Sequence, residues 1–535
     1  MKLLYNTIKT VFFVALSSTL LWSCTKLDVD VKSEITPDNF PKTQEDFIAL
    51  TGPAYTYLSS SAYVIDQILV QELSGDGAII TANGGNWYDG ARYKQLHLHM
   101  VDGDHRFIGE MWTTWFNGIS KINSIMPLLA NSEQSEFKKT TIAEMRTLRA
   151  FYYFLLMDNF GGVPIITDFG PSVQLKSQDS REDVFNFIEK EVNESIPDLR
   201  ENKDISTYSK TTKWMAYALL AKLYINSEVY TGIKRYDDAV KACDMIIQHA
   251  TTAGDIGLDN NYLKMFDIDN GPQIKDFLFA IPCDAYQTTH YPARYWLHAA
   301  LRQKYSLPFN PSGSMKVIPE YYDKFLNSPG DIRTNIFLTG KQYYYNGNPV
   351  TINTTNSGLD NSYSGPNPSA PVVYQLEFTR NIVFRDLATF ETGNDQLGLA
   401  IGYRVNKFRA DSTSTTRNQN NDLPVFRYAD ILLTKAEALL RGAAPTMGHT
   451  PVALANMVRQ RANATLYTTI SLDELLDERA RELAYEGWRR NDLIRFAKFE
   501  DNWGVKTNTD IRKRIFPIPN PQIVLNPLLH QNPSY

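Results

Sequence analysis

Two segments of the sequence carry titratable side chains at spacings that can support catalysis or metal binding. In the first, residues 478–495, four charged residues fall at the spacing of neighbours on one helix, namely Glu478, Arg481, Glu482 and Glu486. Carboxylates and guanidiniums can act as general acids and bases, but at this spacing they also form ion pairs along a helix and to adjacent helices. We interpret this set as structural, and we predict no catalytic residue in it.

The second segment contains His97, His99, Asp102, Asp104 and His105. If His97 and His99 alternate on a strand, both rings point to one face, which is how a zinc site can begin. The segment is also typical of a plain structural motif without a metal, and we expect neither a metal nor another cofactor. The motifs of zinc proteases, serine hydrolases and nucleotide-binding loops do not occur in the sequence. We therefore predict that the protein is not an enzyme.

Helices are the elements expected to hold these side chains in place. Residues 133–157 carry apolar side chains at helical spacing, and a pair of helical patterns covers residues 212–224 and 236–248. Ala221 and Ala239 are small enough to let the two helices of this pair approach closely. This arrangement is typical of a tetratricopeptide repeat.

The repeat pattern returns near the end of the sequence. Residues 426–440 pair with residues 452–464, and a further helix is predicted over residues 472–496. Between the two sets, residues 250–422 are rich in Gly, Pro, Asn, Ser and Tyr, with short strand-like stretches such as residues 372–378. An irregular segment of this length is usually functional. We therefore predict a mainly α fold, a tetratricopeptide-like helical scaffold with a long, irregular, loop-rich insertion that carries short strands.

Composition and charge limit the possible classes of protein. The chain has 535 residues, is 43% hydrophobic and carries a formal net charge of −5, which suits a globular protein with a large core. Acidic and basic residues are mixed throughout, without the basic stripe that nucleic-acid binding needs, so no nucleic acid is expected as a partner. Because no linker-like stretch divides the sequence, we predict one large domain.

The N-terminus indicates export and lipidation. Two lysines precede an apolar run at residues 11–16, and small residues then lead to Cys24, which is typical of a secretory signal over residues 1–23. Leu-Trp-Ser-Cys, ending at Cys24, looks like a lipobox, so we predict lipidation of Cys24; the alternative is a cleaved signal in which Cys24 is incidental. No later stretch is apolar over the roughly 20 residues that a membrane helix needs. Cys243 is interpreted as a small buried hydrophobe, and its pairing with Cys283 stays open.

Several separate segments resemble the SusD/RagB family. The most specific are residues 426–441, where Arg-Tyr-Ala-Asp is followed by Ala-Glu-Ala-Leu, and the charged residues 478–496. The other matching segments are residues 85–90, 96–99, 458–462, 516–519 and 531–533, together with Trp112. The sequence departs from the family pattern at Asn491, where an aromatic residue is common, and at Ser534, where glycine is common. The resemblance spans nearly the whole chain after Cys24 and is weakest in the insertion.

The resemblance implies a scaffold of about four helix pairs that acts as a lid on a SusC-like TonB-dependent transporter. The known ligands of the family are chiefly glycans, with peptides for the RagB branch. Residues 24–535 would form a single SusD-like domain, with an N-terminal part (24–250), a ligand-binding insertion (251–422) and a C-terminal part (423–535). The protein would be lipid-anchored in the outer membrane and face the cell exterior, and Asp28 and Asp30 resemble the export signal of such lipoproteins.

Aromatic side chains in loops are the candidate binding residues, because a glycan presents apolar C–H faces for stacking and many hydroxyls. Trp87 and Trp296 combine a predicted loop context with aromatic and polar neighbours, in the two regions from which the family draws its ligand platform. The candidates are Trp87, Asp76, Asn86, Tyr88 and Arg92 in one cluster, and Trp296, Tyr286, Tyr291, Arg294 and Tyr295 in the other. Each tryptophan can equally be a buried support of the irregular layer. Tyr343-Tyr344-Tyr345 is a further candidate.

Three other functions stay open at this point. A peptide ligand would favour backbone-pairing groups and apolar pockets over aromatic platforms. A lipoprotein glycosidase would need two carboxylates about 5 to 10 Å apart in a cleft, and no such pair is singled out by the sequence. An assembly protein would use its repeats to bind another protein and no nutrient.

Overall fold

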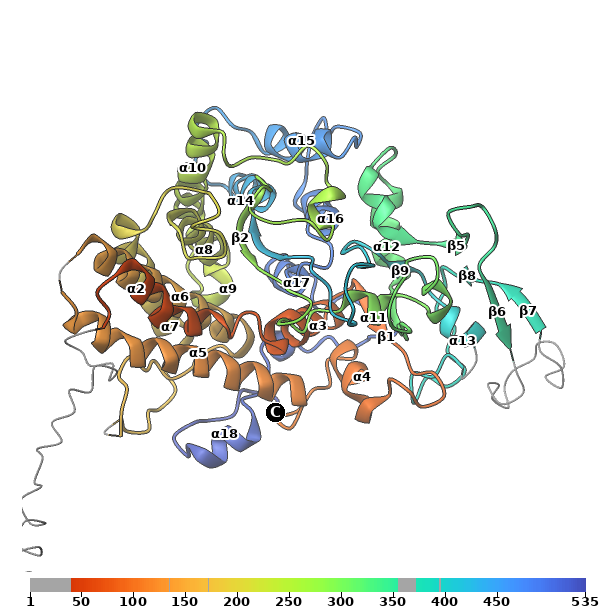
Figure 1. Ribbon diagram of the computed structural model, residues 1–535, viewed down its shortest axis with the longest axis horizontal. Helices are drawn as coiled ribbons and strands as arrows, with labels where there is room; N and C mark the ends of the chain where they lie inside the picture. The colour runs from red at the N-terminus through yellow and green to blue at the C-terminus, as the bar shows by residue number, and fades with distance from the viewer. Residues whose placement is uncertain (1–39, 134, 172, 355–371, 394–395) are drawn as a thin grey trace, which may run out of the picture.

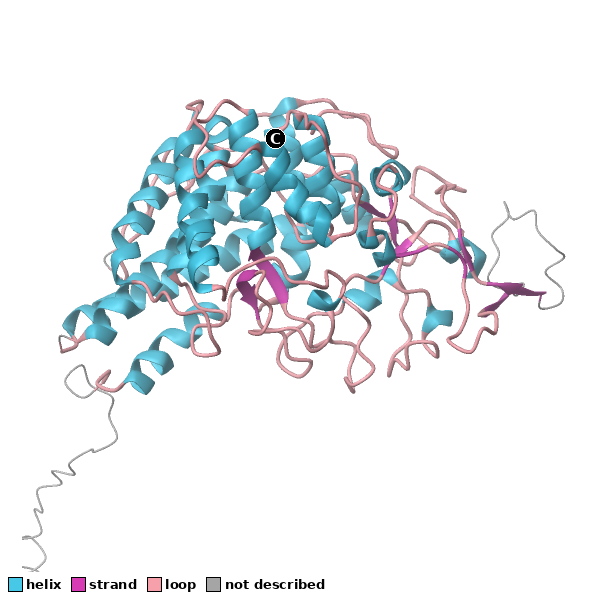
Figure 2. Cartoon of the chain, turned by 90° about the horizontal axis from the view of Figure 1, so that it is seen from above, coloured by secondary structure: helices cyan, strands magenta, loops and turns pink. Residues whose placement is uncertain are grey.

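The computed structural model describes residues 40–133, 135–171, 173–354, 372–393 and 396–535. Long helices gather on one side of the molecule, and the short strands and irregular segments lie on the other (Figure 1). The view from above shows the same division, with helices to the left and strands in the middle and to the right (Figure 2). The fold is mainly helical, as the sequence predicts.

The first part of the scaffold is a series of helices in which each long helix packs on a neighbour in the sequence. These helices are α2 (Gln44–Tyr55), α5 (Arg106–Asn131), α6 (Glu136–Phe160), α7 (Arg181–Ser195), α8 (Lys213–Ile225), α9 (Ser227–Thr231) and α10 (Tyr236–Ala253). The helix predicted over residues 133–157 is α6, and the predicted pair is α8 and α10, which pack against each other. A Cβ on Gly118 of α5 would lie 2.7 Å from the ring of Tyr152 on α6, so only glycine permits this close approach.

The second part of the scaffold packs on the first through α10 and α14. Its elements are α14 (Tyr428–Leu440), α15 (Pro451–Arg461), α16 (Leu472–Glu482), α17 (Arg489–Arg495) and α18 (Asn520–Leu525). The predicted pairing of residues 426–440 with residues 452–464 is confirmed as α14 on α15. The single helix predicted over residues 472–496 is wrong: α16 and α17 are separated by a turn in which Tyr485 (φ 60°) and Gly487 (φ 79°) adopt left-handed conformations.

The strands pair in short antiparallel two-stranded sheets within the described part of the chain. The pairs are β1 (Ala78–Ile80) with β3 (Met315–Val317), β2 (Phe277–Ile281) with β10 (Leu423–Arg427), β4 (Phe337–Leu338) with β9 (Arg404–Val405), β5 (Gly340–Lys341) with β8 (Glu377–Phe378), and β6 (Thr351–Thr354) with β7 (Val372–Gln375). The predicted strand region at residues 372–378 corresponds to β7 and β8. Short helices occupy the same layer: η2 (Ala62–Gln67), α3 (Ile68–Leu73), α4 (Arg92–His97), α11 (Pro292–Trp296), α12 (Pro319–Leu326) and α13 (Gln396–Ala400).

One large apolar core joins the scaffold to the irregular layer, and a smaller one lies within the layer around Leu297, Val350 and Phe378. Cys243 and Cys283 are both buried and unpaired, so the interpretation of Cys243 as a small buried hydrophobe is confirmed. Among the described helices, none is long and apolar enough to cross a membrane.

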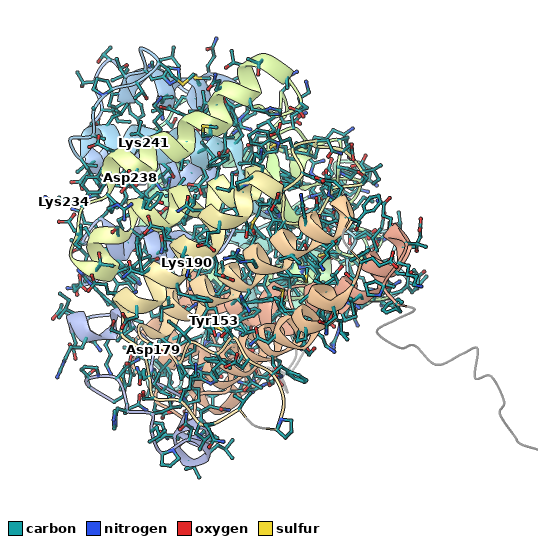
Figure 3. All side chains as sticks on the ribbon, turned by 90° about the vertical axis from the view of Figure 1, so that its left-hand side faces the viewer. Tyr153, Asp179, Lys190, Lys234, Asp238 and Lys241 are labelled. Atoms are coloured by element: carbon teal, nitrogen blue, oxygen red, sulfur yellow. The ribbon has the colours of Figure 1, made fainter. Side chains whose placement is uncertain are left out.

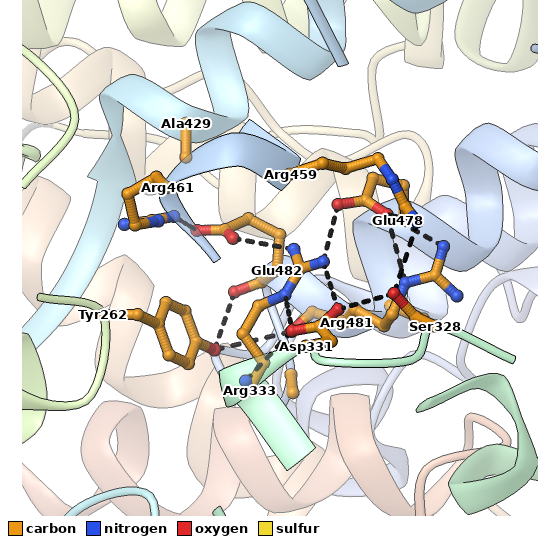
Figure 4. Close-up of polar contacts among 12 residues, drawn as sticks. Tyr262, Ser328, Asp331, Arg333, Ala429, Arg459, Arg461, Glu478, Arg481 and Glu482 are labelled. Carbon is orange, nitrogen blue, oxygen red and sulfur yellow. Dashed lines mark hydrogen bonds and ion pairs between the residues drawn. The ribbon is translucent and has the colours of Figure 1, made fainter. Parts of the chain in front are cut away.

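The charged helix is structural, as predicted from its spacing. Arg333 lies 2.8 Å from Glu478 and 3.1 Å from Glu482, and Arg461 lies 2.5 Å from Glu482 (Figure 4). Glu486 pairs with Arg427 at 2.7 Å. These side chains are buried, and within each pair the opposite charges compensate each other. The pairs hold α16 and the turn after it against the insertion, α15 and β10.

The outer face of the scaffold carries charges of both signs. Figure 3 shows Lys190, Lys234, Asp238 and Lys241 along this face, and Lys241 pairs with Asp238 at 3.0 Å. Ion pairs between exposed side chains contribute little to stability. This mixture of charges is what a solvated helical surface presents.

Candidate ligand-binding site

The loop of residues 83–91 forms one side of the candidate site and is held by its own backbone and by Glu391. Asn83 and Asn86 exchange two backbone hydrogen bonds of 2.9 and 3.1 Å. The Glu391 carboxylate accepts hydrogen bonds from the backbone N–H groups of Gly84 (2.9 Å) and Gly85 (3.1 Å). Both glycines have positive φ, which glycine adopts without strain. A segment that the sequence predicts as an irregular loop therefore has a fixed backbone.

Trp87 stands at the centre of this loop. Its own φ is 67°, a conformation that costs free energy in a bulky residue and is maintained by the surrounding contacts. The Trp87 ring is half-buried, and its centroid lies 6.0 Å from that of Tyr93 and 5.3 Å from that of Tyr295. Trp87 is thus positioned by aromatic neighbours while part of its surface stays accessible.

The opposite side of the site is the short helix α11. Tyr291 and Tyr295 are four residues apart and stack with a centroid distance of 5.6 Å and an interplanar angle of 11°. The guanidinium carbon of Arg294 lies 5.0 Å from the Trp87 ring, 5.4 Å from the Tyr291 ring and 5.7 Å from the Tyr295 ring. We call Trp87, Tyr291, Arg294 and Tyr295 the aromatic platform.

The platform joins residues from both clusters that the sequence analysis singled out. Tyr295 is only 8% exposed, so the ring faces open to a ligand are those of the half-buried Trp87 and Tyr291, and the half-buried Arg294 guanidinium offers several N–H donors in one plane. Burial raises the pKa of the Tyr295 phenol, so this side chain stays neutral and supports the rings of Trp87 and Tyr291 without adding a charge. The arrangement can stack on the C–H face of a sugar ring while donating hydrogen bonds to its hydroxyls.

The other candidates of the first cluster divide into exposed and buried residues. Asn86 and Tyr88 are exposed beside Trp87. Arg92 donates to the Asp89 carbonyl at 3.0 Å, and its guanidinium lies over the Tyr93 ring at 5.7 Å. Asp76 lies elsewhere, because it is buried and receives two hydrogen bonds of 2.6 and 2.7 Å from Arg489. This pairing gives Asp76 a structural role, and we leave it out of the platform.

The second cluster likewise contains both buried and exposed residues. Trp296 is only 7% exposed, and its ring packs on that of Tyr485 with a centroid distance of 4.9 Å, so it is a buried support of the irregular layer. Tyr286 is 72% exposed and lies within 3.4 Å of the Thr415 hydroxyl. In the further candidate segment, Tyr345 is 80% exposed, and its ring lies 6.4 Å from that of Tyr305.

His97, His99 and His105 each contact different residues and do not face one common point. His97 packs edge-on against Phe390, and His99 stacks on Phe499 with a centroid distance of 4.2 Å. The Nε2 atom of His105 lies 3.0 Å from the Arg92 carbonyl. Over the residues that the structure describes, no group of three or more His, Cys, Asp or Glu side chains is arranged to hold a metal ion.

Sequence reasoning missed three residues that shape the site. Tyr93 supports Trp87, Arg417 lies over the Tyr291 ring at 4.9 Å, and Glu391 holds the loop. Tyr93 is adjacent to a predicted candidate, Arg92, and its aromatic ring was a usable signal. Arg417 and Glu391 come from distant parts of the insertion, where the sequence carries no regular pattern that would place them.

Comparison with known proteins gives two family matches. Residues 388–535 match the SusD family, and residues 53–225 match a family described as starch-binding associating with outer membrane. Together the two matches cover more than half of the chain.

Individual relatives extend over most of the chain. Starch-binding protein SusD of Bacteroides thetaiotaomicron is 26% identical over 424 residues, which are 74% of this chain and 72% of that protein. SusD-like protein P38 of Formosa agariphila is 23% identical over 99% of both chains. Among solved structures, surface glycan-binding protein A of Bacteroides thetaiotaomicron in complex with laminarihexaose has a TM-score of 0.67 at 20% identity, covering 92% of this chain and 100% of that chain. At this level of identity, the similarity to the solved structure shows a shared fold.

Two of these proteins, starch-binding protein SusD and surface glycan-binding protein A, are named for binding. The family matches cover both the first helices of the scaffold and its C-terminal repeats, which are the regions where the sequence motifs lie. The chain belongs to the SusD/RagB family.

Proposed function

We propose that this protein is a cell-surface receptor that binds a nutrient glycan on the aromatic platform and passes it to a SusC-like TonB-dependent transporter. The observation that carries this proposal is the meeting of Trp87 with Tyr291, Arg294 and Tyr295. Rings that are held by their neighbours lose little conformational freedom on binding, which favours recognition of a flexible oligosaccharide. No covalent step is part of the proposal.

A glycan is supported as the ligand class by two independent considerations. The platform offers ring faces and planar donors, which match the C–H faces and hydroxyls of sugars. The relatives include a starch-binding protein and a glycan-binding protein in complex with laminarihexaose. We therefore rank an α- or β-linked glucan among the first ligands to test.

We further propose that the protein is lipidated at Cys24 and faces the exterior of the outer membrane. Cys24 lies outside the described residues, so this part rests on the sequence and on the family description of association with the outer membrane. In the same scheme, residues 24–250 and 423–535 form the scaffold of a single domain, and residues 251–422 supply most of the ligand-binding layer. Membrane fractionation of Cys24→Ala, compared with the wild type, tests the anchor directly.

The binding test uses the chain without its first 24 residues. Maltoheptaose, laminarihexaose and a mixture of oligopeptides are titrated against it, with tryptophan fluorescence as the readout, and the ligands are then analysed for chain length. We expect saturable binding of a glycan and an unchanged chain length. Peptide binding without glycan binding would place the protein in the RagB branch, and shortened glycans would identify a glycosidase.

The transporter partner needs a separate experiment. The full-length protein, carrying an affinity tag at its C-terminus, is purified from mildly solubilised outer membranes, and the co-purifying proteins are identified by mass spectrometry. We expect a SusC-like TonB-dependent transporter in amounts comparable to the tagged protein. A tagged protein that co-purifies with other proteins and without such a transporter would favour an assembly role.

A further inference from the structure

A small pocket lies beneath the aromatic platform. It has a volume of about 60 Å³ and shares Tyr291 and Tyr295 with the platform. Most of its remaining wall is apolar and includes Val64, Leu69 and Met315. At the rim, Tyr291 and three further lining residues, namely Ile68, Pro292 and Asn406, are only half-buried. Because Tyr291 and Tyr295 belong to both, the pocket adjoins the platform.

Two polar side chains of this pocket have atoms without a partner. The Oε2 atom of Glu72 and the Nε2 atom of His290 are buried and make no hydrogen bond to any residue in the described part of the chain. The Glu72 side chain is 0% exposed and that of His290 is 4% exposed. The other carboxyl oxygen of Glu72, Oε1, accepts a hydrogen bond from the backbone N–H of Gly487 at 2.9 Å. Leaving a buried polar atom unpaired costs free energy, which a ligand that pairs with it recovers.

The two side chains are uncharged at neutral pH. Burial raises the pKa of Glu72 to about 8 and lowers the pKa of His290 to about 4. The Glu72 carboxyl group can therefore donate one hydrogen bond. Lys407 also lines the pocket, but its Nζ atom is engaged by Glu486 at 2.5 Å and by the Ala484 carbonyl at 2.7 Å. The polar groups that remain for a ligand suit a neutral molecule with a hydrogen-bond acceptor.

The size of the pocket limits the group that it can accept. A cavity needs about 10–15 Å³ to hold one water molecule, so a pocket of about 60 Å³ has room for a small substituent only. A sugar ring is larger, and its hydroxyls need more polar partners than Glu72 and His290 provide. An ester-linked acetyl group has three non-hydrogen atoms, with one methyl group for the apolar wall and one carbonyl oxygen that accepts a hydrogen bond.

We infer that this pocket binds the O-acetyl group of an acetylated glycan whose sugar ring stacks on the aromatic platform. The inference rests on the proposed function and adds a substituent specificity to it. The wall formed by Val64 and Ile65 belongs to η2, a π-helix, and π-helical turns occur frequently at functional sites. The carbonyl oxygen of the acetyl group would accept the hydrogen bond of Glu72, and the methyl group would pack near Leu69 and Met315.

The first test compares acetylated and deacetylated forms of the same polymer by calorimetric titration. Acetylated glucomannan and acetylated xylan are each measured before and after mild alkaline deacetylation. We expect binding to weaken at least tenfold on deacetylation. Equal affinities for the two forms of each polymer would overturn the inference and leave the platform function intact.

Two pairs of variants assign the preference to the pocket. Glu72→Leu removes the donor and is expected to abolish the preference for the acetylated form, whereas Glu72→Gln keeps a donor and most of the shape and is expected to retain it. Leu69→Phe fills the pocket and is expected to lose the preference while binding the deacetylated polymer as the wild type does. Leu69→Ile is the matched control, and thermal unfolding checks that each variant is folded. A preference that survives both Glu72→Leu and Leu69→Phe would place acetyl recognition elsewhere.

A second measurement examines the pocket without any glycan. The protein is labelled with [methyl-13C]methionine, and the Met315 signal is assigned with Met315→Leu. Ethyl acetate is expected to shift this signal saturably, whereas ethanol is not, and Leu69→Phe is expected to suppress the shift. If ethyl acetate does not shift the Met315 signal, the pocket inference is overturned even if glycans bind. A normal response without any glycan binding would instead contradict the proposed function.

Discussion

The ring centroids of Trp87 and Tyr295 lie 5.3 Å apart at an interplanar angle of 61°. Trp87 belongs to the loop of residues 83–91, and Tyr295 belongs to α11 in the insertion. The contact therefore joins the N-terminal part of the chain to the insertion at the place where we expect the ligand. One segment is a loop and the other a helix of five residues, and both pack against the large core that joins them to the scaffold.

Arg294 connects the three rings of the platform, so its planar guanidinium should contribute to binding. A cation over an aromatic face at a partly exposed site is worth about 0.5–1 kcal/mol, which corresponds to a roughly two- to fivefold change in affinity. We expect Arg294→Ala, which removes the cation, to weaken glycan binding by at least this factor, and Arg294→Lys, which keeps a cation but loses the planar donors, to weaken it less. Calorimetric titration measures both variants, and Arg380→Lys, at an exposed arginine outside the platform, serves as control. Unchanged affinity in Arg294→Ala would remove this residue from the site.

Glu391 should determine how rigid the Trp87 loop is. Its carboxylate accepts hydrogen bonds from the backbone N–H groups of Gly84 and Gly85, and also from that of Gly393 at 2.8 Å. Glu391→Ala removes these acceptors, so we expect faster hydrogen exchange at Gly84 and Gly85 and weaker glycan binding. Glu377→Ala changes an exposed glutamate outside the loop and should alter neither. Wild-type exchange rates in Glu391→Ala would mean that the loop is held by other contacts.

The buried ion pairs of α16 should make stability sensitive to acid. The Arg333, Arg481 and Arg459 guanidiniums outweigh the effect of burial and lower the pKa of Glu478 to about 2. Because the pKa is lower in the folded protein than in the unfolded chain, the stabilisation is present above about pH 4.5 and is lost as the pH falls toward 2. We expect the melting temperature of the wild type to fall in this range and that of Glu478→Gln to be lower already at pH 7. A flat melting temperature from pH 5 to 3 would contradict this assignment.

The contribution of Glu72 to stability should depend on pH in the opposite direction to that of Glu478. Burial raises its pKa to about 8, so the folded protein holds this proton more tightly than the unfolded chain does. Its contribution to stability is present below about pH 4.5 and is lost as the pH rises through 8. We expect Glu72→Gln to lose less stability than the wild type between pH 5 and 9, as measured by chemical denaturation. Parallel pH profiles of the two proteins would show that Glu72 is ionised in the folded state.

The sequence predicts the scaffold well because its helices carry strong periodic patterns. The α8–α10 and α14–α15 pairs follow directly from the spacing of apolar and small residues. The interruption between α16 and α17 could not be predicted, because the apolar and charged spacing continues through it. At the break, Gly487 adopts a left-handed φ of 79° and a Cβ there would lie 2.6 Å from the Ile68 side chain, so both the backbone conformation and the packing require glycine.

The binding site could be predicted only in part, because its contacts also depend on the tertiary structure. Composition indicates which loops are rich in aromatic residues, and it led to Trp87, Tyr291, Arg294 and Tyr295. It does not indicate which of these rings face each other, nor that Trp296 is buried against Tyr485. Contacts between irregular segments are set by the whole fold, so residues such as Glu391 and Arg417 become recognisable only in the structure.

The most direct test of the account is calorimetric titration of the wild type and of Trp87→Ala with laminarihexaose and maltoheptaose. Removing the Trp87 ring takes away a stacking surface, and we expect at least a tenfold loss of affinity, about 1.4 kcal/mol, for the glycan that the wild type binds. Trp87→Phe should retain part of the affinity, and Tyr345→Ala, outside the platform, should retain all of it. Equal affinity of the wild type and Trp87→Ala, or loss of binding only in Tyr345→Ala, would contradict the aromatic platform as the binding site.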